Sequence, residues 1–198
     1  MNKMLIVAVS ITIAITAAAS MTGIFTITST QIALAQGNST NPAETNFLTY
    51  ENSTFGIKMQ YPSSWAKQTT GQGVNFVLLA NGKNNLEQFL AKVNVTSIMG
   101  FPPNVPLKAM ADRVVDGYRH FLGNFQIKSY TNTTVGGNNA IIIVYSYTNT
   151  KNNSFNATDI ATIKNDRLYV IQYYAESSKY QSYLPTLQKM IDSFQIKK

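Results

Sequence analysis

Apolar and polar residues alternate in several short segments of the chain, and this two-residue period predicts β-strands. In residues 55–61, Ile57, Met59 and Tyr61 fall on one face, and the residues between them are polar. Residues 47–51 and 55–61 flank an Asn-Ser-Thr turn, which predicts a hairpin, and Trp65 is assigned to the core beside Tyr61. The same reasoning predicts strands at residues 73–80, 89–99, 125–130, 140–147, 159–163 and 168–175.

Two other segments carry apolar residues at helical spacing, which places those residues on one face of a helix. Residues 107–122 form the first, with Pro106 at a favourable N-terminal position and Gly123 just past the end. Residues 180–194 form the second. Pro185 falls inside it, and because proline lacks a backbone donor, we expect it to begin the main helical segment after a looser turn.

Together these elements predict an α+β fold, with a single antiparallel sheet flanked by helices. Short turns at residues 136–139, 149–153 and 164–166 separate consecutive strands, so neighbouring strands should pair antiparallel. The apolar run from Ile141 to Val144 is typical of a central strand that is covered on both faces. Residues 47–198 are therefore expected to form one domain with a core of its own.

The N-terminal segment differs in composition from the rest of the chain. Lys3 is the only charged residue before Glu44, and most residues up to Ala35 are apolar or small. The tripeptide that ends at Ala35, Ala-Leu-Ala, has the small-x-small pattern of a cleavage site, and a polar linker, residues 36–46, follows it. We predict a signal peptide at residues 1–35, cleaved after Ala35, and hence a secreted or extracytoplasmic protein. An uncleaved N-terminal helix that anchors the protein is the alternative.

Charge and cysteine content narrow the expected partners. The chain has no cysteine, which excludes disulfides, thiolate metal ligands and a cysteine nucleophile. The net charge is +7, from 16 basic and 9 acidic residues, and loss of Lys3 with the signal peptide lowers it to +6. The basic residues are spread along the chain, whereas nucleic-acid-binding proteins usually concentrate them on one face. We therefore expect no nucleic-acid partner, and the charge fits solubility or weak attraction to anionic lipid or glycan.

Sequons for asparagine-linked glycosylation recur through the chain after the signal segment. The candidate acceptors are Asn38, Asn52, Asn94, Asn132, Asn152 and Asn156. Asn38 is in the linker, Asn52 is in a predicted turn, and Asn94 is on the outward side of a predicted strand. The other three are placed in or beside polar loops, so no sequon is expected in the core.

Asp112, Asp116 and His120 recur every four residues on the first predicted helix, so they lie along one polar flank. Oxygen and imidazole ligands that converge would suit a metal ion, which makes these three residues the candidate metal ligands. The alternative is a solvated face with ion pairs, because Lys108 lies four residues before Asp112 and Arg119 lies three after Asp116. Residues eight apart are also too distant to share one ion directly.

The sequence carries no recognisable catalytic signature. His120 is the only histidine and lies on a helix, so a serine-histidine-aspartate triad lacks its parts. The glutamates show no paired spacing for glycoside hydrolysis. The Gly71-Gln72-Gly73 and Gly136-Gly137 segments lack the spacing and the following Lys-Ser/Thr of a phosphate-binding loop. We therefore expect neither an enzyme nor a bound cofactor.

Tyrosines are concentrated in the C-terminal half of the chain. They are Tyr145, Tyr147, Tyr169, Tyr173, Tyr174, Tyr180 and Tyr183. Exposed tyrosines would stack on the sugars or rings of a partner. Packing within the sheet and core is the alternative, because tyrosine favours strands.

Two segments resemble a known family. The first is YENSTFGIKMQYPSSW, from Tyr50 to Trp65, and the second is YVIQYYAE at residues 169–176, which leads into Leu184-Pro185 and Ser193-Phe194-Gln195-Ile196. They resemble the start and the end of the PsbP-like domain, named for an extrinsic subunit of the photosystem II oxygen-evolving complex. The resemblance covers most of the chain after the linker and implies a sheet sandwiched by helices, a fold shared with the Ran-binding Mog-type proteins. These are fold motifs, so no functional residue carries over.

The resemblance and the signal peptide together imply a secreted or cell-surface, non-enzymatic accessory or binding subunit. Its expected partner is a membrane-associated protein complex at the outer face of a membrane, and the resemblance does not imply photosynthesis here. The alternative, suggested by the tyrosines and the basic charge, is an envelope module that binds a small molecule or a glycan.

Overall fold

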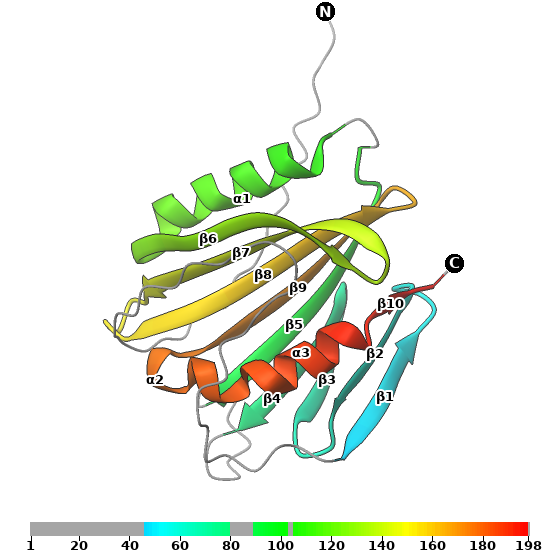
Figure 1. Ribbon diagram of the computed structural model, residues 1–198, viewed down its shortest axis with the longest axis horizontal. Helices are drawn as coiled ribbons and strands as arrows, with labels where there is room; N and C mark the ends of the chain where they lie inside the picture. The colour runs from blue at the N-terminus through cyan, green and yellow to red at the C-terminus, as the bar shows by residue number, and fades with distance from the viewer. Residues whose placement is uncertain (1–45, 80–88, 103–104, 198) are drawn as a thin grey trace, which may run out of the picture.

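The largest element of the structure is a seven-stranded antiparallel sheet (Figure 1). The computed structural model describes residues 46–79, 89–102 and 105–197. The strands of this sheet are β3 (Ala66–Thr70), β4 (Gly73–Leu79), β5 (Phe89–Met99), β6 (Gly123–Val135), β7 (Asn138–Thr148), β8 (Ser154–Lys164) and β9 (Arg167–Glu176). Their order across the sheet is β3-β4-β5-β9-β8-β7-β6, so β5 pairs with a strand that lies far along the chain.

One face of this sheet packs against the C-terminal helices and a second, smaller sheet. The helical elements are α2 (Ser177–Tyr180), the 3₁₀ turn η2 (Gln181–Tyr183) and α3 (Leu184–Asp192), and α3 lies in front of the sheet in Figure 1. The small sheet consists of β1 (Phe47–Asn52), β2 (Ile57–Pro62) and β10 (Gln195–Ile196), with β2 in the middle. A single core joins these elements, and its fully buried members include Ile57, Met59, Phe76, Ile171, Tyr173, Leu187 and Met190.

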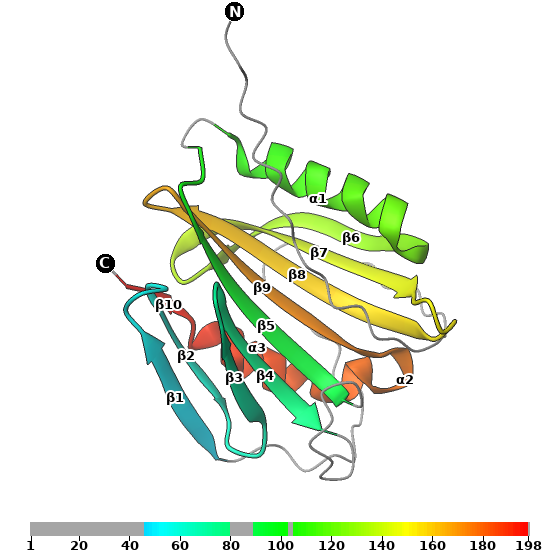
Figure 2. The same ribbon diagram turned by 180° about the vertical axis from the view of Figure 1, so that it is seen from behind.

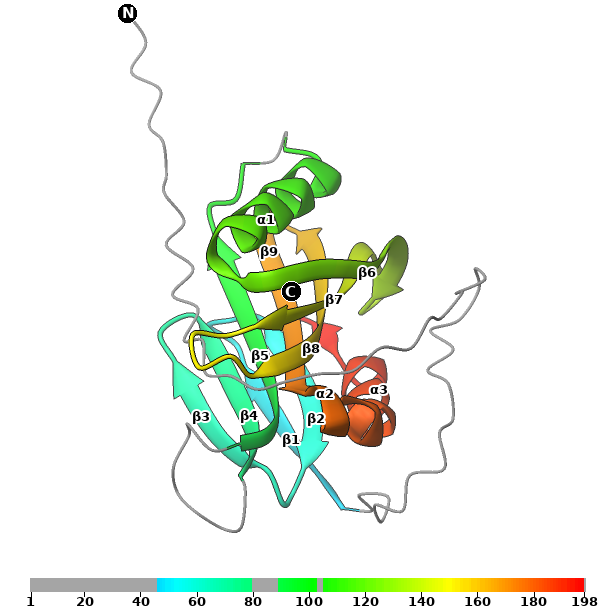
Figure 3. The same cartoon turned by 90° about the vertical axis from the view of Figure 1, so that its left-hand side faces the viewer.

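The opposite face is covered by α1 (Leu107–Phe121), which packs on β6, β7 and β8. Figure 3 shows α1 and α3 on opposite sides of the sheet. The helix buries Met110, Ala111, Val115 and Tyr118, the stripe that helical spacing predicts. In the view from behind, no helix of the described residues lies over β3, β4 and β5 (Figure 2). That half of the face is called the open half below.

The predicted fold class is confirmed, and several details of the pattern are observed directly. Ile57, Met59 and Tyr61 are buried, and Trp65 is 3% exposed within the same core. Pro185 is the second residue of α3, and the looser turn before it is the 3₁₀ turn η2, as proline chemistry requires.

Three details differ from the sequence-based expectation. The first hairpin does not join the main sheet, because β2 pairs instead with β10 at the C-terminal end of the chain. Strand β3 was not predicted, since all five of its residues are exposed and none alternates with an apolar partner. Strands β6 and β8 begin or end several residues beyond their predicted limits, because the added segments are rich in polar residues, exposed in β6 and largely buried in β8.

The predicted signal peptide and nearly all of the linker lie outside the described residues. Among the residues that are described, no helix combines the length and the apolar character needed to cross a membrane.

Candidate functional site: a polar row across the sheet

Five polar residues lie directly opposite one another on five adjacent strands. They are Gln68 on β3, Asn75 on β4, Asn94 on β5, Gln172 on β9 and Asp159 on β8. Residues that face each other in an antiparallel pair project from the same side of the sheet, so the five side chains form one line. This line, the polar row, runs on the α1 face from the open half to a position beneath the helix.

The buried end of the row is the carboxylate of Asp159, which is 4% exposed. Its Oδ2 atom accepts hydrogen bonds from the hydroxyl of Tyr118 at 2.6 Å and from Nε2 of Gln172 at 3.2 Å. Its Oδ1 atom accepts a hydrogen bond from the hydroxyl of Tyr145 at 3.3 Å. A buried carboxylate needs several donors of this kind, because burial without them is costly.

Burial raises the pKa of Asp159 to about 6, and the three hydrogen bonds act in the opposite direction. Burial, and then the neighbouring charge of Asp159, raise the pKa of both Tyr118 and Tyr145 well above the ordinary value. The two phenols therefore stay protonated and remain donors over the physiological range. Above pH 6 the centre is an ionised acceptor surrounded by donors, which is an arrangement for holding α1 in place.

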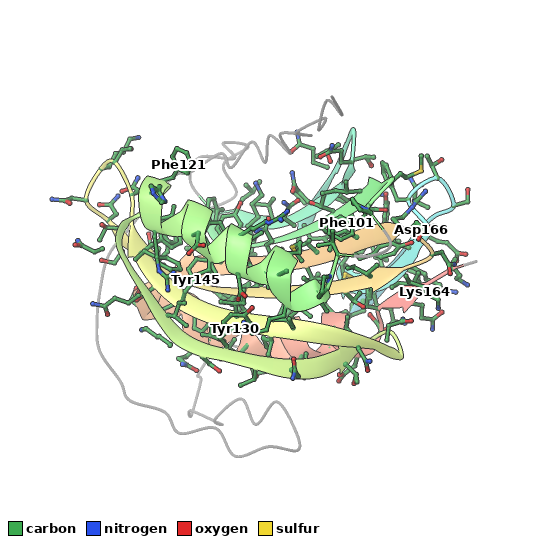
Figure 4. All side chains as sticks on the ribbon, turned by 90° about the horizontal axis from the view of Figure 1, so that it is seen from above. Phe101, Phe121, Tyr130, Tyr145, Lys164 and Asp166 are labelled. Carbon is green, nitrogen blue, oxygen red and sulfur yellow. The ribbon has the colours of Figure 1, made fainter. Side chains whose placement is uncertain are left out.

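Figure 4 shows how the helix and the strands contribute to this end of the row. Tyr145 lies on the strands beneath α1, and Phe121 lies at the C-terminal end of the helix. Tyr118 projects from α1 toward β8, where it also accepts a 3.0 Å hydrogen bond from Nε2 of Gln172. One phenol thus joins the helix to two neighbouring strands.

At the open end, the row has polar groups without partners. Asn94 donates through Nδ2 to Oε1 of Gln172 at 3.3 Å, which leaves its Oδ1 atom unused among the described contacts. Asn75 is 9% exposed, and its side-chain amide makes no hydrogen bond with any residue that the structure describes. Gln68, the last residue of the row, is exposed.

Lys92 flanks the open end, two residues before Asn94 on β5. Its ammonium lies 5.6 Å from the ring centre of Tyr174, the residue opposite it on β9. Lys92 is half-buried, and burial lowers its pKa. Within the described ranges it forms no salt bridge, and the ring of Tyr174 is the neighbour identified for its charge.

The three candidate metal ligands on α1 do not converge. Asp112 binds Nζ of Lys108 at 2.8 Å and accepts a 2.6 Å hydrogen bond from the hydroxyl of Tyr130 on β6. Asp116 pairs with Arg119 at 2.7 Å, and Nδ1 of His120 lies 2.7 Å from the backbone oxygen of Asp116. The described residues contain no group of three or more acidic, histidine or cysteine side chains able to hold a metal.

The sequons occupy varied environments. Asn132 and Asn152 are exposed, and Asn152 has a left-handed backbone with φ of 62°. Asn52 accepts a hydrogen bond from the backbone of Phe55 in the predicted turn, and Asn94 belongs to the polar row. Asn38 lies outside the described residues.

The placement of Asn156 beside a polar loop was wrong. Asn156 lies within β8, is 9% exposed, and accepts a hydrogen bond from Nζ of Lys128 at 3.2 Å. The strand begins earlier than its apolar residues indicated, which draws this asparagine into the sheet. In the folded domain its amide is not accessible for glycan attachment.

The tyrosine-rich half of the chain forms core and not surface. Six of the seven tyrosines are buried, and only Tyr174 is half-exposed, on the α1 face. Tyr173 donates a 2.8 Å hydrogen bond to the backbone of Tyr180, and Tyr180 in turn shares a hydrogen bond with Thr158. These phenols satisfy internal acceptors, so they do not form an aromatic cleft.

A cavity of about 890 Å³ lies between the β6–β7 hairpin and α3. Its lining includes Thr133, Gly136, Gln188 and Asp192. Gln188 and Asp192 are already joined by a 2.6 Å hydrogen bond from Nε2 to Oδ1. The Oε1 atom of Gln188 is buried and has no hydrogen-bond partner among the described residues.

Sequence reasoning did not single out the members of the polar row. Asp159 is an acid in the middle of a strand, between Thr158 and Ile160, which is unusual and was the available signal. The sequence pattern places it at the start of a predicted strand, residues 159–163, where a charge is ordinary. The amides carry no such signal, because only the non-local pairing of β5 with β9 places Asn94 opposite Gln172.

Comparison with solved structures places this fold among known relatives. Cyanobacterial PsbP (CyanoP) from Synechocystis sp. PCC 6803 superposes with a TM-score of 0.57 at 13% identity, covering 82% of this chain and 98% of that one. LpqN of Mycobacterium tuberculosis, described as involved in cell envelope biogenesis, gives 0.53 at 12% identity, covering 77% and 91%. A mutant of the protein Mog1 gives 0.52 at 11% identity, covering 76% and 96%.

No curated protein matches the chain. The family model described as PsbP-like protein matches residues 5–196, which is nearly the whole sequence. It spans the small sheet, the seven-stranded sheet and both helical layers. The chain therefore belongs to the PsbP-like family.

Proposed function

We propose that this protein is a non-enzymatic binding domain that acts outside the cytoplasm, as an accessory subunit at the outer face of a membrane. The observation that carries the proposal is the asymmetry of the polar row. At its buried end Asp159 has three donors, whereas at its open end Asn75 and Lys92 have no polar partner among the described residues. The buried end holds the helix, and the open end is available to a partner.

The chemistry of the open end supports binding over catalysis. Its side chains are amides and one ammonium, which donate and accept hydrogen bonds but do not make a nucleophile-base pair. Asp159, whose pKa is near neutrality, is enclosed by three donors beneath α1, away from any substrate. His120 is exposed on α1 and is held against the backbone of Asp116.

An extracytoplasmic location is supported by the N-terminal sequence and by the relatives. The signal-like segment ending at Ala35 and the polar linker after it have the composition of an export signal. A structural relative from Mycobacterium tuberculosis is described as taking part in cell envelope biogenesis. The accessory role follows the family, because PsbP itself is an extrinsic subunit.

The alternative function, a cleft of exposed tyrosines that binds sugars, is not supported, because six of the seven tyrosines that suggested it are buried. Any glycan site must therefore rest on other residues.

Two measurements test the proposed function: cell fractionation for the location of the protein, and photo-crosslinking for its partner. In fractionated cells, we expect the protein in the extracytoplasmic or membrane-surface fraction. Because the chain has no cysteine, Gln68→Cys places a single thiol at the open end for a photo-crosslinker. Lys67→Cys is the matched control, since it lies one residue away on the opposite face of β3. A membrane protein crosslinked from position 68 and not from 67 supports the proposal, and a cytosolic protein, or equal crosslinking from both positions, refutes it.

A further inference from the structure

The cavity between the β6–β7 hairpin and α3 has the size of a small-molecule site. Its volume is about 890 Å³, and pockets for small ligands commonly span about 300–1,000 Å³. The hairpin and the end of the chain meet there, since a Cβ added to Gly136 would lie 3.3 Å from the backbone oxygen of Phe194. Figure 1 shows the hairpin beside α3 and β10. The lining belongs to the α3 side of the sheet, away from the polar row.

The lining combines an apolar floor with polar residues at the mouth. The apolar lining residues are buried members of the core, and they are Val135, Ile191, Phe194 and Ile196. Asp192, Thr134 and Gln195 are exposed and mark the side that opens to solvent. An apolar chain that lies on the floor is removed from water, which favours its binding. The ligand that fits this lining therefore has an apolar part and a polar end.

One carboxylate sets the charge of the cavity. Asp192 is the only charged residue of the described lining. Its Oδ1 atom accepts the 2.6 Å hydrogen bond from Nε2 of Gln188, and no described residue forms a salt bridge with it. Complementary charge favours binding, so the polar end of the ligand is expected to be positive.

The basic residues near the cavity do not neutralise this carboxylate. The ammonium of Lys189 lies 5.5 Å from the centre of an aromatic ring on β1. Lys197 is drawn to Glu51 on the same strand, at 3.5 Å. Lys164, at the end of β8, neither lines the cavity nor forms a salt bridge with a described residue. The negative charge of the lining is therefore available to a ligand.

Gln188 adds an acceptor that has no donor. Its Nε2 atom must face Asp192, because an amide oxygen in that place would meet the carboxylate, so its Oε1 atom turns the other way. Oε1 is buried and accepts no hydrogen bond from a described residue. A buried acceptor without a donor is costly, and native structures rarely leave one in that state. The cavity therefore favours a ligand that donates hydrogen bonds.

A protonated amine satisfies both oxygens at once. The oxygen and nitrogen of an amide are about 2.3 Å apart, so Oε1 of Gln188 lies no more than about 5 Å from Oδ1 of Asp192. A charged nitrogen bonds to oxygen at about 2.7–2.9 Å, so one ammonium between the two atoms reaches both. An ammonium has three donors and no acceptor. A metal ion fits less well, because calcium takes six to eight oxygen ligands and the described residues include no cluster of three acidic or histidine side chains.

We propose that this cavity binds a small organic amine in its protonated form. The ammonium bonds to Asp192 and to Oε1 of Gln188, and the apolar part of the ligand lies on Val135, Ile191 and Phe194. The inference goes beyond the proposed function and does not depend on it, because the cavity and the polar row lie on opposite sides of the sheet.

The test is a titration of the full chain followed by NMR, with three probes that share a six-carbon chain. They are hexylammonium, hexanol and hexanoate, which differ in the charge of the head group. We expect hexylammonium to bind most tightly and to shift the amide signals of Gly136 and Gly137. Asp192→Asn removes the charge and Gln188→Met removes the acceptor, both at similar volume. Each should weaken the binding of hexylammonium about tenfold, as expected for loss of one hydrogen bond to a charged group.

Asp116→Asn is the matched control. It removes the same charge from another exposed helical acid, on α1 and on the opposite side of the sheet. Its substitution should leave the affinity for hexylammonium unchanged. Circular dichroism and the melting temperature of each variant establish that the fold is retained before titration. The comparison of the three probes uses the unaltered protein, so it decides the charge of the ligand even where a variant does not fold.

Several outcomes would overturn the proposal. Equal binding of hexanol and hexylammonium would show that the apolar chain alone is recognised. Equal losses from Asp116→Asn and Asp192→Asn would reduce the effect to net charge. Signal changes that do not saturate, or that spare the β6–β7 hairpin, would reject the site. None of these results bears on the proposed function, which fractionation and crosslinking test separately.

Discussion

The hydroxyl of Tyr118 on α1 donates a 2.6 Å hydrogen bond to the buried carboxylate of Asp159 on β8. This contact joins a helix from the middle of the chain to a central strand of the sheet, 41 residues later. The polar row extends outward from it through Gln172 and Asn94. The position of α1, and with it one wall of the open half, therefore depends on a polar contact within an apolar layer.

Tyr118→Phe should destabilise the protein by about 1–3 kcal/mol, because it leaves a buried charge with one donor fewer. Tyr130→Phe is the control, since Tyr130 donates a bond of the same length to Asp112, which is only half-buried. Urea denaturation should give the larger loss for position 118. Equal losses would show that the Asp159 centre contributes no more than a surface hydrogen bond.

The stability of the domain should depend on pH through Asp159. The folded-state pKa is about 6 and the ordinary value is 3.8, so the folded protein binds the proton more tightly than the unfolded chain does. The contribution of this group is then most favourable below pH 4 and is lost as pH rises from about 4 to 6. Each pKa unit is worth about 1.4 kcal/mol, so the loss amounts to about 3 kcal/mol.

Asp159→Asn isolates this effect, because asparagine does not titrate. Glu51 and Asp112, whose pKa values are lowered by their basic neighbours, act in the opposite sense in both proteins and cancel in the comparison. The free energy of unfolding of the wild type minus that of the variant should fall between pH 4 and pH 7. A difference that is constant or rises with pH contradicts the raised pKa.

Local pattern was sufficient for most of the fold. The alternation around Ile57 and Met59 places both in the core, and the stripe on α3 buries Leu187 as expected. Strand β3 and the two-residue β10 are not predicted by the sequence pattern, and the reason is physical. Their strand conformation comes from pairing with β4 and β2, and neither segment has an apolar alternation of its own.

The site was less predictable than the fold, because the residues of the polar row come together only through the register in which distant strands pair. Nothing near Asn94 in the sequence indicates that Gln172 faces it, and nothing near Asp159 indicates that Tyr118 reaches it. Candidate ligands chosen by helical spacing alone, such as Asp112 and His120, have local partners instead. The spacing of residues within one helix is enough to predict ion pairs along it. A row of side chains across five strands can be predicted only when the pairing of those strands is known.

Two glycines should respond in opposite ways to alanine. Gly117 lies within α1 and an added Cβ meets no atom within 4 Å, so Gly117→Ala should stabilise the protein by about 0.5–1 kcal/mol through helix propensity. A Cβ on Gly73 would lie 1.8 Å from the backbone oxygen of Val95. Gly73→Ala should therefore lower the free energy of unfolding by about 3 kcal/mol, the upper end of the range for overpacking. Thermal melting of both variants checks the signs, and a rise for Gly73→Ala would contradict the close approach of β4 and β5.

The helix flank provides a direct test of the metal alternative. Asp116 pairs with Arg119 on an exposed surface, and such pairs contribute less than about 1 kcal/mol. Asp116→Ala should leave the melting temperature nearly unchanged, and calcium, manganese or zinc at millimolar concentration should neither release heat nor raise it. A metal-dependent rise that Asp116→Ala abolishes would restore the metal site.

The closing helix tests the core that joins the two sheets. Leu187 is 2% exposed and belongs to the cluster that holds Ile57, Met59 and Trp65, so Leu187→Ala should cost about 2–5 kcal/mol, as cavities left by buried leucines do. Lys189 lies two residues later, and its side chain is exposed. Lys189→Ala should cost under about 0.5 kcal/mol. Against a typical total of about 5–15 kcal/mol, the first change should lower the melting temperature visibly and the second should not. Equal melting temperatures for the two variants would mean that α3 presents another face to the sheet.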